Sequence, residues 1–196
     1  MGAEAQGDSC RRDPGANVCA LFVVNADDTG LDEVLSSAAF SGLSLNPSPD
    51  GHSLLYVRWA EGEPGGIHIV DIETATDHRV QLDGFPETVN VYQAQFSPDG
   101  THILFDWLGV TDNYWGVVPV TGGAPVKLGP AWPQGPDGHG PEAYYSPDGK
   151  SIVAFYPHID GTTEVWLLDP TGGQAGGDRK LSLSSPHSPV WQRVAR

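Results

Sequence analysis

The sequence is poor in basic residues, cysteine, methionine and long apolar runs. It has 10 Lys and Arg against 25 Asp and Glu, a formal net charge of -15. This acidic balance argues against nucleic-acid binding, because a phosphate backbone is bound by clustered positive charge. No stretch reaches the length of about 18 apolar residues that a membrane-spanning helix needs. We therefore expect a chain with no nucleic-acid partner and no membrane span.

The first 17 residues contain neither an apolar alternation nor the apolar stretch of a signal peptide. We predict a flexible tail over 1–17, and the compartment stays open. The two cysteines, Cys10 and Cys19, lack the number and spacing of a zinc site. Two interpretations of them stand: a disulfide in an exported protein, or a buried Cys19 with a free Cys10 in the tail.

Catalytic signatures are missing as well. The sequence has no Gly-x-Ser-x-Gly elbow and no His-Glu-x-x-His motif, and its seven histidines are scattered. Residues 25–30 copy half of a calcium loop, but Ser36 stands where the closing Glu belongs, which favours a plain turn. We predict no catalytic residue, no cofactor and no metal. Histidines gathered from separate repeats are the alternative.

Turn residues and repetition are what the sequence has in abundance. Ser-Pro-Asp-Gly occurs at 48–51, 97–100 and 146–149, a spacing of 49 residues each time. Ser and Asp bond to nearby backbone, Pro presets φ, and Gly accepts a positive φ. An apolar run follows each copy at the same spacing, beginning at Leu54, Ile103 and Ile152. Each copy therefore predicts a β-hairpin.

Every unit continues with a third apolar run and a short closing strand. Four short strands in 40 to 50 residues are typical of a propeller blade. Residues 31–39 also fit a helical stripe, but the repeat register favours a strand there. The predicted units are a half blade at 18–37, blades at 41–83, 91–129 and 142–183, and the first strand of a further blade at 187–194.

Residues 96–128 and 145–181 pass through an aromatic residue, Ser-Pro-Asp-Gly, two apolar strands, Thr-Gly and a closing Leu. In this order they resemble the TolB-like β-propeller repeat, a relative of the WD-type repeat. The resemblance implies an all-β array of four-stranded antiparallel blades. It also implies a periplasmic or extracellular protein. The family includes an envelope protein, gating propellers of peptidases and lyases, so the resemblance does not fix the chemistry.

Three full blades and partial blades at both ends predict an open arc. The N-terminal part offers a third and a fourth strand and the segment around Trp191 a first strand, so a second strand is lacking. Open blade edges are sites of self-association, which we expect here. A closed four-bladed ring is the alternative, because 196 residues equal four repeat lengths.

In such an array, the loops that leave each second strand and those that enter each first strand lie at one end. Long loops on a rigid scaffold are where binding concentrates. The candidate binding residues in these loops are Trp107, Asp112, Trp132, Asp137, His139, Glu142 and His158. Packing between blades is the alternative role of the tryptophans.

The sequence thus favours a non-catalytic binding or scaffold propeller that recognises a protein, peptide or glycan on its loop-rich face. The alternative is the propeller part of an enzyme, either a gating domain of a prolyl-oligopeptidase-like hydrolase or a lyase with axial histidines.

Asp106 breaks the repeat, since Val57 and Phe155 occupy the matching positions. Residues that break a local rule are often functional or strained. We expect a buried carboxylate that accepts at least two hydrogen bonds, because an unpaired one would be costly.

Overall fold

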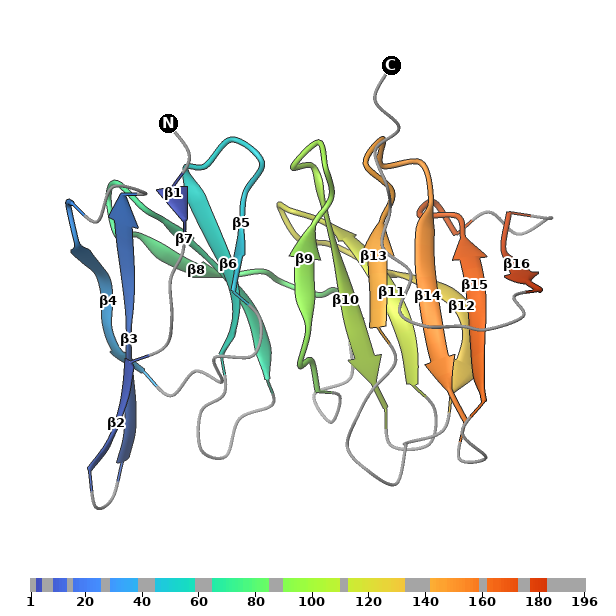
Figure 1. Cartoon of the computed structure of the whole chain (residues 1–196), viewed down its shortest axis with the longest axis horizontal. Coiled ribbons are helices and arrows are strands. Elements are labelled where there is room, and N and C mark those ends of the chain that lie inside the picture. The colour runs from blue at the N-terminus through green and yellow to red at the C-terminus, as the bar shows by residue number, and fades with distance from the viewer. Residues whose placement is uncertain are drawn as a thin grey trace.

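The structure, a computed structural model, describes residues 3–4, 9–13, 16–25, 29–38, 45–58, 65–84, 90–109, 113–132, 142–158, 162–172 and 177–182. The regular elements in these ranges are strands, which form four antiparallel sheets standing in a row (Figure 1). We number the sheets 1 to 4 from the N-terminus. This arrangement confirms the predicted all-β array of four-stranded blades.

Sheets 2, 3 and 4 are the three predicted full blades, and each is a simple meander of four neighbouring strands. Sheet 2 contains β5 (Asn46–Pro47), β6 (Ser53–Arg58), β7 (Gly66–Asp71) and β8 (Asp77–Arg79). Sheet 3 contains β9 (Ala94–Phe96), β10 (His102–Leu108), β11 (Asn113–Pro119) and β12 (Val126–Trp132). Sheet 4 contains β13 (Glu142–Tyr145), β14 (Ile152–Pro157), β15 (Thr163–Leu168) and β16 (Arg179–Leu181).

The three Ser-Pro-Asp-Gly turns have one geometry. In the second copy, Ser97 N donates to His102 O at 2.8 Å, and Gly100 N donates to Ser97 O at 2.9 Å, with φ of Gly100 at 71°. The other two copies repeat both bonds and the positive φ. A Cβ at Gly100 would lie 3.5 Å from Pro49, and one at Gly149 would lie 3.6 Å from Pro98. The turns therefore follow one another along one end of the row, as predicted (Figure 1).

Sheet 1 differs from the predicted half blade. It contains β1 (Ala3–Glu4), β2 (Ser9–Asp13), β3 (Ala16–Asn25) and β4 (Asp32–Ala38). The expectation that no second strand precedes β3 is wrong, because β2 pairs with it. A polar edge strand needs only backbone hydrogen bonds, so the absence of apolar alternation in residues 1–17 does not exclude it. The strand interpretation of residues 31–39 is confirmed by β4.

The positions of β1 and β2 on β3 show how this edge is built. Glu4 lies opposite Val24 and Ser9 lies opposite Ala20, so both strands run antiparallel to successive parts of β3. Cys10 and Cys19 are Cα partners in this ladder, and the two interpretations of these cysteines both stay open. The predicted strand at 187–194 lies outside the described residues.

The row does not close on itself. Sheets 1 and 4 lie at its opposite ends, and the named strands pair only within their own sheets (Figure 1). The described part of the chain is thus an open array rather than a closed four-bladed ring.

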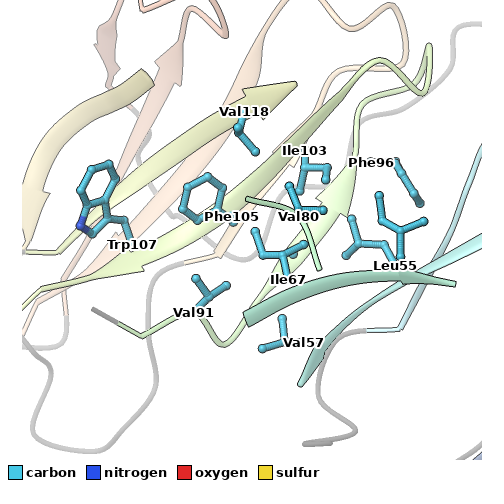
Figure 2. Packing of buried hydrophobic residues seen from close by; sticks show 12 residues of the cluster. Leu55, Val57, Ile67, Val80, Val91, Phe96, Ile103, Phe105, Trp107 and Val118 are labelled. Carbon is cyan, nitrogen blue, oxygen red and sulfur yellow. The ribbon is translucent and has the colours of Figure 1, made fainter. Parts of the chain in front are cut away.

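Both faces of the inner sheets are buried, which explains why their strands are continuous apolar runs. Along β6, Leu54 and Tyr56 pack toward sheet 1, whereas Leu55 and Val57 pack toward sheet 3. Figure 2 shows the seam between sheets 2 and 3, where Ile67 and Val80 meet Ile103 and Phe105. Burial of apolar surface in each seam stabilises the packing of the two neighbouring sheets by about 25 cal/mol per Å².

Candidate functional site

The end of the row opposite the Ser-Pro-Asp-Gly turns carries those predicted binding residues that the structure describes. The chain leaves β6, β10 and β14 at this end (Figure 1). Trp107 and Trp132 are buried there, with 9% and 7% of their surface exposed, whereas Glu142 and His158 are exposed. Asp112, Asp137 and His139 lie outside the described residues.

Trp107 and Trp132 occupy different seams. Trp107 packs in the seam between sheets 2 and 3, where its ring stacks on Phe105 with centroids 6.5 Å apart. The ammonium group of Lys127 lies 4.4 Å from the centroid of Trp107 and 4.3 Å from that of Tyr114. A cation between two aromatic faces stabilises this edge of the seam. The structure therefore does not bring the two predicted tryptophans together.

Trp132 belongs to a polar and aromatic group in the seam between sheets 3 and 4. Its ring centroid lies 5.5 Å from those of both Trp115 and Tyr156. Asn113 is the Cα partner of Trp132 across β11 and β12, and its side chain is buried. We call Asn113, Trp115, Trp132 and Tyr156 the seam cluster.

The seam cluster has three buried polar atoms without a hydrogen-bond partner among the described residues. They are Oδ1 of Asn113, Nε1 of Trp115 and the hydroxyl of Tyr156. Burial, and next the charge of Asp178, raise the pKa of Tyr156, so this hydroxyl is a neutral donor. An unsatisfied buried polar group costs about 1–3 kcal/mol. Three such atoms therefore lie in one seam without a partner among the described residues.

A charged group lies beside the seam cluster. Glu164 is the Cα partner of Tyr156, so its side chain starts from the same face of sheet 4. It accepts hydrogen bonds from Lys180 Nζ at 2.5 Å and Trp166 Nε1 at 3.1 Å, and these hold the pKa of its carboxyl below its usual range. Nε2 of His158 lies 3.4 Å from the same carboxylate. His158, one of the predicted binding residues, thus lies at the rim of the seam cluster.

Glu142 is placed differently. It is the Cα partner of Phe155, whose side chain packs on the other face of sheet 4 with Val153 and Val165. Paired residues share a face of a sheet, so Glu142 does not join the seam cluster.

Asp106 is buried, as predicted, with 5% of its surface exposed. Its Oδ1 accepts hydrogen bonds from Tyr92 N at 2.7 Å and Gln93 N at 2.8 Å. Phe105 pairs with Ala94, and Leu108 forms a bridge with Asn90. The segment 90–94 therefore contains one residue more than the segment 105–108 that it faces. The carboxylate binds the amide groups that this bulge leaves out of the ladder.

The predicted site did not include Asn113, the first residue of β11, or Trp115 and Tyr156, which lie in apolar strands. A signal was present in Asn113, a polar residue two positions before a buried Trp on the same strand face. Metal binding finds no support in the described residues, among which no three His, Cys, Asp or Glu side chains form a ligand group. The described part of the chain also has no helix long and apolar enough to span a membrane.

Four-stranded meanders placed face to face in a row define a β-propeller architecture, here an incomplete one. Comparison with known proteins specifies it further: the fold is that of the TolB-like propellers. TolB from Acinetobacter baumannii matches with a TM-score of 0.63 at 22% identity, over 90% of this chain and 41% of its own. The chain thus spans less than half the length of that TolB.

Propeller domains of peptidases are similar too. The propeller domain of the trilobed protease from Pyrococcus furiosus, described as having an open velcro topology, matches with a TM-score of 0.59 at 12% identity, over 93% of this chain and 58% of its own. Acylaminoacyl peptidase from Pyrococcus horikoshii matches with a TM-score of 0.60 at 14% identity, over 90% and 30%. No family model and no curated protein matches the sequence.

Proposed function

We propose that this chain is a non-catalytic binding or scaffold propeller that recognises a protein, peptide or glycan at its loop-rich end. The observation that carries the proposal is the seam cluster, in which three polar atoms beside aromatic rings have no partner among the described residues. Ligand sites combine apolar and aromatic walls with a few convergent polar groups. The charged pair of Glu164 and Lys180 at the rim adds the polar boundary that surrounds such sites.

The unpartnered atoms allow binding to be separated from stability. Tyr156→Phe and Asn113→Leu remove polar atoms that no described residue bonds. We expect the free energy of unfolding of each variant to equal that of the parent protein or to exceed it by up to about 1 kcal/mol. Binding of the ligand found on a peptide or glycan array should weaken about tenfold, because each lost bond is worth about 1.4 kcal/mol.

Tyr145→Phe is the matched control. The hydroxyl of Tyr145 is also buried and unpartnered among the described residues, but β13 ends there at the Ser-Pro-Asp-Gly turn. This variant should keep full binding. Equal binding by all three variants would remove the seam cluster from the proposal.

The second candidate is the propeller part of an enzyme, with peptidase propellers among the similar structures as its support. The coding sequence next to this chain tests it, because a gating propeller requires an adjoining hydrolase domain. We also propose self-association through the open ends of the row. Phe22 and Val24 are only half-buried on β3, and light scattering of the purified chain measures the association.

A further inference from the structure

A second polar group lies in the seam between sheets 1 and 2, apart from the seam cluster. Tyr56, His68 and Arg79 are successive Cα partners across β6, β7 and β8. Arg58 and Gly66 form the next row on the same face, two residues along each strand. Paired residues share a face and lie about 5 Å apart, so these side chains meet at the loop-rich end of sheet 2.

His68 is held in one orientation. Its Nδ1 lies 3.1 Å and 3.2 Å from the two carboxylate oxygens of Asp77, and its ring is 5.4 Å from that of Tyr56. Burial lowers the pKa of His68, against the opposing charge of Asp77, which keeps the imidazole neutral at pH 7. A carboxylate only accepts hydrogen bonds, so Nδ1 carries the proton and Nε2 presents a lone pair.

Two arginines lie beside this histidine, and neither has a carboxylate partner among the described residues. Arg58 and Arg79 form no ion pair with a described residue, in a chain with 25 acidic and 10 basic residues. Both guanidinium charges act on His68 and lower its pKa further. Arg79 crosses the face of Gly66, where a Cβ would lie 2.8 Å from Arg79 Nε. Arg58 is the Cα partner of Gly66, so Arg79 Nε lies over the residue that pairs with Arg58.

We propose that Arg58, Arg79 and His68 bind a hydroxycarboxylate group. Arginine recognises a carboxylate through two parallel N–H bonds, and a pair of arginines fixes its position. Nε2 of His68 then accepts a hydrogen bond from a donor beside the carboxylate. A hydroxyl fits this place, because an ammonium group would add a third positive charge next to two guanidinium groups.

The test is an NMR titration of the full chain at pH 7 with sodium glycolate, following the His68 ring resonances. Acetate, which lacks the hydroxyl, phosphate and N-acetylglycine are titrated in parallel. We expect saturable shifts with glycolate. Acetate, phosphate and N-acetylglycine should each bind more weakly than glycolate, by about threefold or more. Arg58→Gln and Arg79→Gln should each weaken glycolate binding about tenfold, the loss of one charge-assisted hydrogen bond. Gly66→Ala should weaken it as well, since Arg79 has to move.

Lys150→Gln is the matched control, because it removes one positive charge at the Ser-Pro-Asp-Gly end. It should change glycolate binding less than twofold, roughly the effect of a distant screened charge. Acetate bound as well as glycolate would overturn the role of His68. Tighter binding of phosphate or N-acetylglycine would overturn the ligand class, and an equal loss in Lys150→Gln would overturn the site. The outcome is independent of the seam cluster, which lies between other sheets.

Discussion

The two ends of the same sheets differ in how strictly they repeat. At the turn end, Ser48, Ser97 and Ser146 each donate to the Asp two residues on, at 2.5, 2.6 and 2.6 Å. At the loop-rich end, the seam between sheets 1 and 2 holds a histidine and two arginines, and the seam between sheets 3 and 4 holds the seam cluster. The turn end, where the side chains repeat, therefore has a structural role. At the loop-rich end the side chains, and with them the chemistry, differ from blade to blade.

The physical reason lies in hydrogen-bond satisfaction. Each turn uses its own Ser and Asp side chains to satisfy the backbone groups of the hairpin, so it needs no external partner. The loop-rich end has three buried polar atoms that the described residues do not satisfy, whereas the turn end has one, the hydroxyl of Tyr145. Variants at the two ends should thus separate effects on folding from effects on binding.

Substitution of Asp106, the residue that breaks the repeat, has the largest expected effect on stability. Asp106→Leu removes the acceptor of two backbone N–H groups and should lower the free energy of unfolding by about 2–4 kcal/mol. Asp106→Asn keeps one acceptor oxygen and should lose about half as much. Urea denaturation at pH 6 measures both. A Leu variant as stable as the Asn variant would contradict the anchoring role of the Asp106 carboxyl group.

The pH dependence of stability provides a second measurement on the same carboxyl. Burial raises the pKa of Asp106 from 3.8 to about 7, against the backbone bonds from Gln93 and Tyr92. Between these values the folded protein holds a proton that the unfolded chain has released. The free energy of unfolding therefore falls as pH rises from about 4 to about 7. Asp106→Asn lacks this proton, so a stability difference from the parent that stays constant across the window would contradict the assignment.

The turn serines should have a smaller effect. Ser97→Ala removes the donor to Asp99 and the acceptor of His102 N, at 2.6 and 2.9 Å, and should cost about 1–2 kcal/mol. Ser146→Ala should match it, since both serines are 5% exposed, and Ser48→Ala should cost less at its more exposed site. Thermal unfolding of the three variants tests this order. Binding at the loop-rich end should be unchanged in all three.

Lys127 has the smallest expected effect. Lys127→Met keeps the aliphatic stem but removes the ammonium group between Trp107 and Tyr114, at a loss of about 0.5–1 kcal/mol. Lys150→Met at the turn end is the control and should be neutral. Equal effects of the two variants would show that the aromatic contact contributes nothing.

The sequence predicted the repeated end far better than the variable one. The 49-residue spacing and the chemistry of Ser-Pro-Asp-Gly were enough for the blades, and the break at Asp106 was enough for a buried carboxylate. Strand β2 was missed because a polar edge strand has no periodic signal. Of the seam cluster only Trp132 was predicted, because the register shift between Asn113 and Trp115 that brings Trp132 opposite Asn113 does not follow from strand periodicity. Gly129, with φ at 68°, lies on β12 at this shift, and strand periodicity does not predict it.

Amide hydrogen exchange with and without the ligand found on the arrays tests most directly whether the loop-rich end is the binding end. We expect slower exchange in the bound state for amides near the seam cluster, in β11 before Trp115 and in the part of β14 around Tyr156. Exchange in the Ser97 and Ser146 turns should not change. Protection of those turns, with no change near the seam cluster, would show that the ligand binds at the turn end instead.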